Sequence, residues 1–272
     1  MCASLPSLPG RIVENRNICG VHMSDQQHRK TPIWDLPTRL FHWTLVLLVG
    51  TNLFLIGPSG GVATVIHLTV GYTVVGLLLF RLAWGFVGSP RSRFADFIHP
   101  WTAVKNYIEG LRRFTPPRSI GHNPLGGWMI IVMLAALAVL VITGMFASGR
   151  YAAGALATFV PVDITALAGD AHQLIANILI ALIIVHLAGV AVDWLLTREN
   201  IVKAMISGRK RLPAEISARE RPLMGSARAA VILVLCLMVV IGLIAKTDFT
   251  LNRASLQQDG TASERTIDQQ PG

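Results

Sequence analysis

Charged side chains are scarce in this sequence. Only 14% of its 272 residues are Asp, Glu, Lys or Arg, whereas a soluble globular domain carries about 25%, and the mean hydropathy is +0.53. Cysteine is also rare, with three residues in the whole chain. The shortage of charge excludes a soluble enzyme and a disordered chain, and the shortage of cysteine excludes a secreted domain held together by disulfides.

What the sequence has instead is long apolar stretches. A transmembrane helix needs about 20 predominantly apolar residues, and continuous apolar runs indicate helices rather than the alternating strands of a barrel. We therefore predict an all-α integral membrane bundle, whose first helix begins near Leu36. Five stretches fit a span: Leu40–Ile56, Val62–Trp84, Gly127–Ala147, Ala171–Leu195 and Ala229–Ala245.

The basic residues are distributed unevenly between the two sides of these spans. Of the 24 Lys and Arg residues, only Arg150, Lys246, Arg253 and Arg265 fall in the segments that alternate with the basic ones. The positive-inside rule therefore predicts a cytoplasmic N-terminus and a C-terminus outside the cell membrane. The net charge of +9 is then a sign of membrane sidedness, and nucleic acid is not an expected partner.

The spans and loops divide the chain into five parts. The first contains Met23, which opens a polar segment and is a candidate for the natural start. Two amphipathic loop stretches, one beginning at Pro100 and one running from Ile201 to Gly208, predict short helices that either lie among lipid headgroups or pack on the protein. The parts are a cytoplasmic N-terminal segment (1–33), a four-helix transmembrane domain (34–211), a basic cytoplasmic linker (212–228), a fifth transmembrane helix (229–245) and a polar periplasmic tail (246–272).

Four of the eight histidines, His42, His67, His172 and His186, lie inside the predicted spans. Ionisable side chains are rare within a membrane and usually functional. His172 and His186 are 14 residues apart, so they share one helix face at depths that differ by about 21 Å. By depth, His42 pairs with His186 near the inner surface and His67 with His172 near the outer surface. The sequence thus predicts two bis-imidazole sites, one above the other.

Neither predicted pair is accompanied by an acid or a cysteine. Zinc needs four ligands, whereas haem iron already has four porphyrin nitrogens and needs only one or two axial ligands. The three cysteines form no C-x-x-C-H sequence, which excludes covalent c-type attachment. We therefore predict two non-covalent haem b groups, an inner one on His42 and His186 and an outer one on His67 and His172. Nearby small residues either give the macrocycles room or serve helix packing; they include Gly71, Gly76 and Ala176.

Several motifs resemble those of the bacterial cytochrome b561 family, which includes the cytochrome b subunit of nickel–iron hydrogenases. The resemblance covers about residues 34–211 and implies a four-helix di-haem core with the same four histidines as axial ligands. The fifth span is a departure from that core. The motifs are WDLPTRLFHW from Trp34, IHLTVGY from Ile66, FRLAWG from Phe80, GHNPLGG from Gly121, AHQ from Ala171, VHL from Val185 and AMISGRKR from Ala204.

The resemblance and the histidine pairs together predict a bacterial inner-membrane cytochrome that carries electrons between the quinone pool and a periplasmic redox protein such as a c-type cytochrome. An alternative is a cytochrome b subunit that anchors a nickel–iron hydrogenase or a similar periplasmic oxidoreductase. An alternative of another class is a proton-coupled transporter, in which acids, broken helices or inverted repeats are expected. Electron transfer is favoured over an enzymatic role, and a homodimer is a candidate assembly.

Three arginines are candidates for contact with the anionic haem propionates. Arg39 and Arg81 are predicted near the inner haem and Arg150 on the outer side, each either as a propionate contact or as a plain interfacial anchor. His122 has two interpretations as well. It either reaches the inner haem edge or a quinone headgroup, or it belongs to a turn before the helix that Asn123 and Pro124 introduce.

Overall fold

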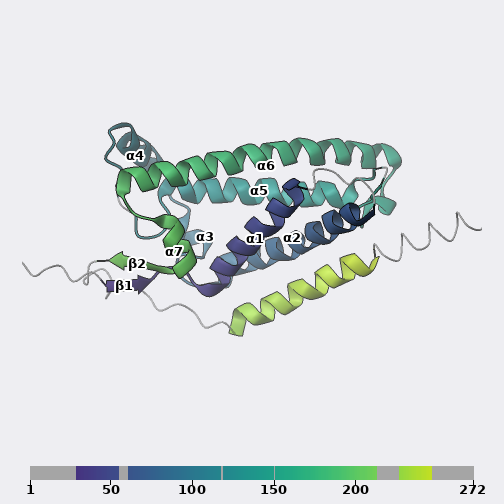
Figure 1. Ribbon diagram of the computed structural model, residues 1–272, viewed down its shortest axis with the longest axis horizontal. Coiled ribbons are helices and arrows are strands. Elements are labelled where there is room, and N and C mark those ends of the chain that lie inside the picture. Colours follow the sequence, from purple (N-terminus) through teal and green to yellow (C-terminus); the bar gives the residue numbers. More distant parts are fainter. Residues whose placement is uncertain (1–28, 55–60, 118, 150, 213–226, 247–272) are drawn as a thin grey trace, which may run out of the picture.

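The computed structural model describes residues 29–54, 61–117, 119–149, 151–212 and 227–246. Met23, the N-terminal segment before Arg29 and the polar tail lie outside these described residues. The long helices are arranged as a bundle (Figure 1), which ends with a helix over Ala227–Lys246. The preceding elements are β1 (Arg29–Pro32), α1 (Leu36–Phe54), α2 (Gly61–Val87), α3 (Phe94–Phe97), α4 (Trp101–Arg112), α5 (Pro124–Phe146), the 3-10 helix η1 (Ala157–Phe159), α6 (Val162–Thr197), α7 (Ile201–Ser207) and β2 (Arg209–Leu212).

Among the described residues, four helices are long and apolar enough to cross a membrane, namely α2, α5, α6 and the last helix. The predicted first span is also a helix, and α1 begins at Leu36 as expected. Its first turns carry Arg39 and His42, which lower its hydropathy below that of the other four. Its 19 residues are about 28 Å long, close to the thickness of about 30 Å of the hydrocarbon layer. The chain is a multi-pass membrane protein built from helices.

The helix α6 is longer than the apolar stretch that predicted it. It has 36 residues and begins at Val162, whereas the apolar stretch begins at Ala171. Asp163 and Asp170 interrupt the apolar pattern, but neither acid prevents a helix. Asp163 lies in the first turn, where a negative charge stabilises the helix dipole. The apolar stretch therefore marked the part of α6 that suits a bilayer and missed the start of the helix.

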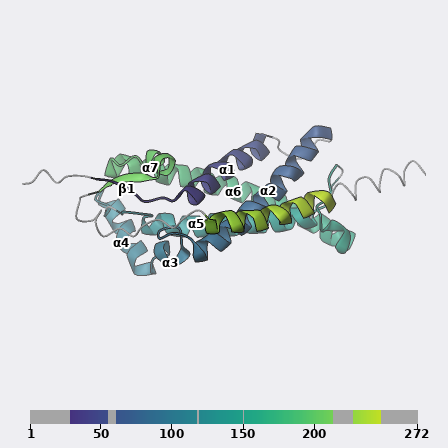
Figure 2. The ribbon, with the colours of Figure 1, turned by 90° about the horizontal axis from the view of Figure 1, so that it is seen from below.

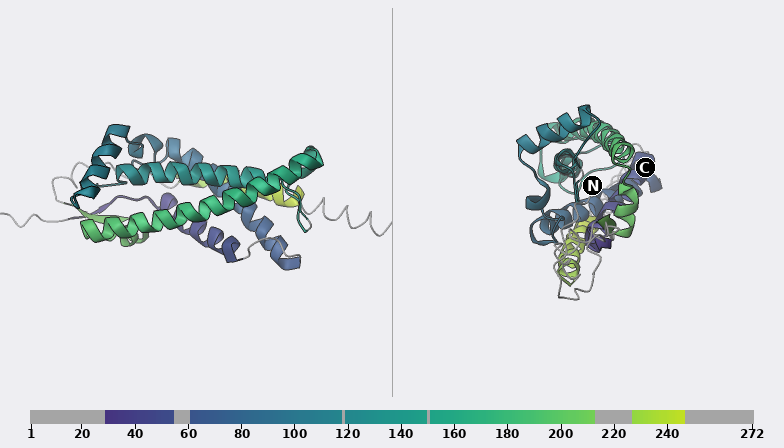
Figure 3. Two further views of the ribbon diagram at one scale, coloured as in Figure 1. Left: turned by 90° about the horizontal axis from the view of Figure 1, so that it is seen from above. Right: turned by 90° about the vertical axis from the view of Figure 1, so that its left-hand side faces the viewer.

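The core of the bundle lies between α2, α5 and α6, with α1 against α2 (Figures 1 and 3). Large apolar side chains fill it because each long helix is apolar around most of its circumference. Burying each such side chain contributes about 1.5–3 kcal/mol. The buried members include Val74, Leu78, Leu134, Leu137 and Leu179.

The last helix packs on α2 through one face. Ala229, Cys236 and Val240 are its buried residues. The two helices approach closely at Gly76, where an added Cβ would lie 2.4 Å from Cγ2 of Val240. Gly76 therefore serves helix packing, and of its two predicted roles the one as space for a macrocycle is not supported.

One end of the bundle carries the short elements (Figure 2). There β1 and β2 pair as an antiparallel ribbon, with Arg29 opposite Leu212, which the prediction of helices alone missed. The Gly208 carbonyl, just after α7, accepts the backbone N–H groups of Ile33 at 2.8 Å and Trp34 at 3.1 Å, and so ties the ribbon to the start of α1. We call this end, with β1, β2, α3, α4 and α7, the ribbon end, and the opposite end, with η1, the far end.

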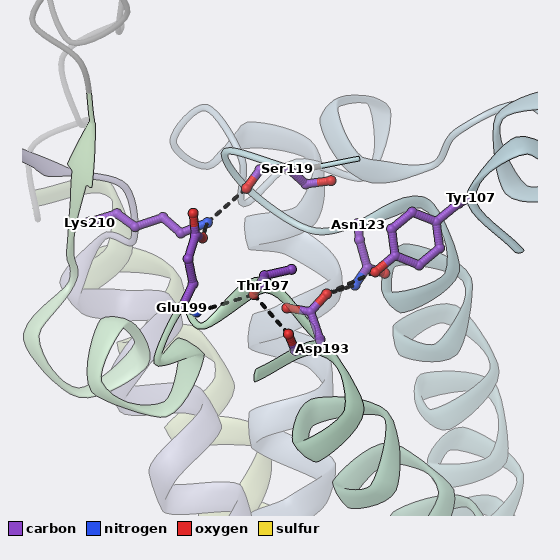
Figure 4. A network of polar contacts seen from close by, with 7 residues as sticks. All are labelled: Tyr107, Ser119, Asn123, Asp193, Thr197, Glu199 and Lys210. Atoms are coloured by element: carbon purple, nitrogen blue, oxygen red, sulfur yellow. Dashed lines mark hydrogen bonds and ion pairs between the residues drawn. The ribbon is translucent and has the colours of Figure 1, made fainter. Parts of the chain in front are cut away.

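Polar contacts join α4 and β2 to the rest of the ribbon end (Figure 4). Asp193 of α6 accepts the Tyr107 hydroxyl of α4 at 2.8 Å and Nδ2 of Asn123 at 3.1 Å. Lys210 of β2 donates to the Ser119 carbonyl at 2.7 Å. Burial and the bond to Asp193 raise the pKa of the Tyr107 phenol, which keeps it a donor. The first loop helix therefore packs on protein through its buried face, and its predicted position among lipid headgroups stays a prediction.

Candidate functional site

The far-end pair consists of His67 on α2 and His172 on α6. Their ring centroids are 6.2 Å apart and the ring planes cross at 77°. Nδ1 of His172 lies 2.9 Å from the Leu140 carbonyl of α5, so this nitrogen carries the proton and the lone pair of Nε2 stays available. Three helices thus meet at the pair predicted from depth alone.

The spacing of the far-end rings suits a single metal ion between them. A metal ion lies about 2 Å from an imidazole nitrogen, and that nitrogen is about 1 Å from its ring centre, so two rings on one ion have centroids about 6 Å apart. The observed 6.2 Å matches this separation. Nδ1 of His67 is buried and has no hydrogen-bond partner among the described residues.

Two glycines leave space beside the far-end pair, and a third fixes its geometry. At Gly71 and Gly169, one turn from His67 and His172, an added Cβ would have no described atom within 4 Å. At Gly144 of α5 an added Cβ would lie 2.8 Å from Cε1 of His172. The His172 ring therefore rests directly on the α5 backbone, and the predicted role of Gly71 as space for a macrocycle stays a prediction.

The ribbon-end pair consists of His42 on α1 and His186 on α6. His42 lies within electrostatic range of His186, as the depth argument predicts. Nδ1 of His42 is buried without a hydrogen-bond partner in the described part of the chain. Within those same residues, no group of three or more His, Cys, Asp or Glu side chains could hold a metal ion. Both pairs therefore offer imidazole nitrogens alone, which suits a haem iron better than zinc.

A buried carboxylate that the sequence analysis missed organises the ribbon end beside this pair. Asp35 is 2% exposed and caps α1, because its Oδ1 accepts the Thr38 N–H at 3.0 Å. Its Oδ2 accepts Nε1 of Trp84 at 2.9 Å and the Ser92 hydroxyl at 3.1 Å. An Asp directly before an apolar helix is an N-cap signal that could have located it.

The guanidinium of Arg81 lies next to this carboxylate. Arg81 is 3% exposed and interacts electrostatically with Asp35. Its Cζ lies 5.0 Å from the Phe94 ring centroid and 5.6 Å from that of Phe97. Its NH1 nitrogen is buried and lacks a hydrogen-bond partner among the residues that the structure describes. Its predicted contact with a haem propionate stays a prediction.

His122 packs into the same cluster. Its ring centroid is 4.4 Å from that of Trp34 and 5.0 Å from that of Phe97. Burial, with a smaller contribution from Arg81, lowers the pKa of His122 to about 3, so the ring is neutral. His186 is also within its electrostatic range. Asn123 caps α5, accepting the Gly126 N–H at 2.6 Å, so the predicted turn exists, and the predicted contact of His122 with a haem edge or a quinone stays a prediction.

The other two predicted arginines have different outcomes. Arg39 donates from NH1 to the Ile206 carbonyl at 2.6 Å and so ties α1 to α7. Its predicted propionate contact stays a prediction. Arg150 lies outside the described residues.

Comparisons with known proteins found one family model and several relatives. A family model described as prokaryotic cytochrome b561 matches residues 33–208. A protein from Rhizobium leguminosarum bv. viciae named "Probable Ni/Fe-hydrogenase B-type cytochrome subunit" is 24% identical over 211 residues, 65% of this chain and 87% of that protein. A protein of the same name from Cupriavidus necator is 23% identical over 220 residues, 70% of this chain and 90% of that protein. The comparison with solved structures found no match.

Proposed function

The chain belongs to the prokaryotic cytochrome b561 family, and on that premise we propose that it binds two haem b groups through which electrons cross the membrane. Family membership makes it a membrane b-type cytochrome for electron transfer. We assign His67 and His172 to one iron and His42 and His186 to the other. Each bound haem supplies a one-electron oxidation and reduction at its iron.

The separation of the far-end rings carries this proposal. Their centroids, 6.2 Å apart, leave room for one ion between two imidazoles. Because His172 is bonded to the Leu140 carbonyl, its ring keeps one orientation and one tautomer, which is how ligating histidines are usually held. His67 and His172 would hold the iron with two imidazole nitrogens, and such ligation would favour electron transfer over oxygen binding.

The helix α6 supports a route for electrons across the membrane. It contributes His172 to one site and His186 to the other, 14 residues or about 21 Å further along the same face. The apolar core residues between the sites, among them Leu134 and Leu137, exclude water from this route.

The partners and the orientation belong to the same proposal. The ribbon carries Arg29, Lys30 and the run Arg209–Arg211, which supports a cytoplasmic ribbon end in the bacterial inner membrane under the positive-inside rule. The far-end haem then lies toward the periplasm. We propose that quinone exchanges electrons with one haem and that a periplasmic redox protein exchanges them with the other.

The haem count tests the proposal directly. We expect the purified chain to hold about two haem b per polypeptide in a pyridine haemochrome assay, with a low-spin reduced-minus-oxidised spectrum. His172→Ala should lose the far-end haem and His186→Ala the ribbon-end haem, each leaving about one. The control is His99→Ala, a loop histidine whose carbonyl accepts Nε1 of Trp128 at 3.0 Å, which should keep both. A colourless protein from a host with ample haem would contradict the proposal.

The names of the relatives favour a second candidate, a cytochrome subunit that serves a nickel–iron hydrogenase. The relatives from Rhizobium leguminosarum and Cupriavidus necator both carry that name. Membranes that contain the chain should then show haem reduction by hydrogen gas, and this reduction should vanish when the host's hydrogenase genes are deleted. Reduction by quinol that persists in the deletion strain would instead favour the stand-alone cytochrome. The proton-coupled transporter has no comparable support.

A further inference from the structure

We infer that Arg81 and His122 together form a seat for a carboxylate at the ribbon end, namely a propionate of the haem assigned to His42 and His186. This inference rests on the proposed function. Its ground is a pair of buried nitrogens, NH1 of Arg81 and Nδ1 of His122, for which the described residues offer no hydrogen-bond partner. Such nitrogens cost free energy unless an acceptor reaches them.

The position of Arg81 on α2 places it at the depth of the ribbon-end pair. It follows His67 by 14 residues, the same interval that separates His172 from His186 on α6. Arg81 therefore lies on the face of α2 that carries His67 and about 21 Å along the axis. Where α6 has its second histidine, α2 has an arginine.

Asp35 leaves Arg81 with unused hydrogen-bonding capacity. The Asp35 carboxylate already accepts three bonds, from Thr38, Trp84 and Ser92, out of the roughly four that a carboxylate can accept. Arg81 has five N–H donors in a planar fork, and the NH1 end of that fork is the one without a partner. A second carboxylate would satisfy it.

His122 links the arginine to the histidine pair. Phe97 packs against both, with its centroid 5.0 Å from the His122 ring and 5.6 Å from Cζ of Arg81. His186 is within the electrostatic range of the same ring. Phe97 thus joins the two unpartnered nitrogens in one cluster, with His122 contributed by the loop before α5 and Arg81 by α2.

A haem propionate is the acceptor whose chemistry fits these donors. It is an anionic carboxylate that accompanies the macrocycle into the bundle, where an unpaired charge is very costly. Arginine binds a carboxylate through two parallel bonds, and a neutral imidazole adds one more donor. A quinone carbonyl would offer an acceptor oxygen without the charge, so measurements with and without added quinone distinguish it from a propionate.

The test measures the midpoint potential of the ribbon-end haem, identified as the component that His186→Ala removes. His122→Phe keeps the ring packed between Trp34 and Phe97 but removes both nitrogens. With fewer donors the propionate charge is less compensated and favours ferric iron, so we expect the reduction equilibrium to shift about tenfold toward the oxidised haem, or about 59 mV lower. Arg81→Lys keeps the charge but loses the fork and should shift it in the same direction.

The matched control is Arg113→Gln, which removes an exposed guanidinium that pairs with Glu109 at 2.9 Å at the end of α4. Its potentials should equal those of wild type. A second arm loads chain made in a haem-deficient host with haem dimethyl ester, whose propionates carry no charge. With this haem, the reduction equilibria of wild type and His122→Phe should agree within about twofold. The esterified propionate has already lost its interaction with His122, so the substitution removes nothing further.

Several outcomes would contradict the proposed propionate site of Arg81 and His122. One is that His122→Phe and Arg81→Lys hold two haems and have the midpoint potentials of wild type. Another is that the shift in midpoint potential caused by His122→Phe persists with haem dimethyl ester. A shift that requires added quinone would assign the donors to a quinone oxygen instead. All of these leave two haems per chain, whereas a wild-type protein without haem contradicts the proposed function itself.

Discussion

The far-end and ribbon-end histidine pairs share the helix α6 but are supported in different ways. At the far end, His172 rests on the backbone of α5, bonded to the Leu140 carbonyl and pressed against Gly144. At the ribbon end, His42 belongs to α1, and the start of α1 depends on the buried Asp35. Helix packing positions the far-end pair, whereas a buried polar cluster that includes loop residues positions the ribbon-end pair.

Because the two pairs are supported differently, they should be sensitive to different kinds of substitution. A ligand held by backbone and small residues responds to added volume, because the α5 surface beside His172 has no space for a side chain. A ligand held through a carboxylate responds to lost charge, because the donors around Asp35 and the Arg81 guanidinium are buried with it. The two kinds of substitution should therefore affect different ends of the bundle.

The largest effect is expected from Asp35→Asn. This change keeps the size of the side chain but leaves the buried Arg81 without its carboxylate, and breaking a buried charge pair costs about 3–5 kcal/mol. The thermal midpoint should fall, and the ribbon-end haem should be lost or shifted in potential while the far-end haem is retained. Thermal unfolding followed by haem absorbance, together with a redox titration, measures both.

Asp96→Asn is the control for that variant. Asp96 pairs with Arg93 on a half-exposed surface of the neighbouring α3, so its loss should cost at most about 1 kcal/mol. If Asp35→Asn weakened both haems equally, the two ends would form one cooperative unit and the contrast between them would not hold.

A smaller effect, at the opposite end, is expected from Gly144→Ala. The new Cβ would lie 2.8 Å from Cε1 and 2.9 Å from Nδ1 of His172, so the ring must turn away and weaken its bond to Leu140. Overpacking of this kind costs about 1–3 kcal/mol. The haemochrome count should fall from about two toward one per chain, with the ribbon-end potential unchanged.

Gly242→Ala on the last helix serves as the control for this glycine. An added Cβ there would have no described atom within 4 Å, and alanine is the better helix former, so both haems should remain. Unchanged binding and potential in Gly144→Ala would show that the His172 ring can shift freely, and packing would then not be what positions the far-end pair.

The long helices and the histidine pairing could be predicted from the sequence because both depend on periodicity along single helices. Apolar runs indicated the spans, and the interval between His172 and His186 fixed their common face and relative depth. The start of α6 at Val162 was missed because Asp163 and Asp170 end the apolar run without ending the helix. Hydropathy reports suitability for lipid, and helix length follows from hydrogen bonding as well.

The supports of the two pairs could not be predicted in the same way, since they depend on contacts between elements far apart in the chain. The bond from His172 to Leu140 and the approach of Trp84 and Ser92 to Asp35 require the packed bundle. The ribbon pairs Arg29–Pro32 with Arg209–Leu212, two short segments too distant in sequence to suggest one another. Even so, the N-cap position of Asp35 was a local signal that was available.

The smallest expected effect sharpens the comparison at the ribbon end alone. Tyr107→Phe removes the hydroxyl that Asp193 accepts at 2.8 Å, while Asn123 continues to donate to the same oxygen at 3.1 Å. One such bond contributes about 1 kcal/mol, which lowers the thermal midpoint of a chain of this size by about 2–4 °C. Thr73→Val, whose hydroxyl donates to Thr69 within α2 at 2.8 Å, should leave the midpoint nearly unchanged. Since α4 touches α6 seven residues beyond His186, a shift in the ribbon-end potential without one at the far end would place Asp193 within the polar support of that pair. Equal shifts at both ends would mean that α6 transmits the change along its length.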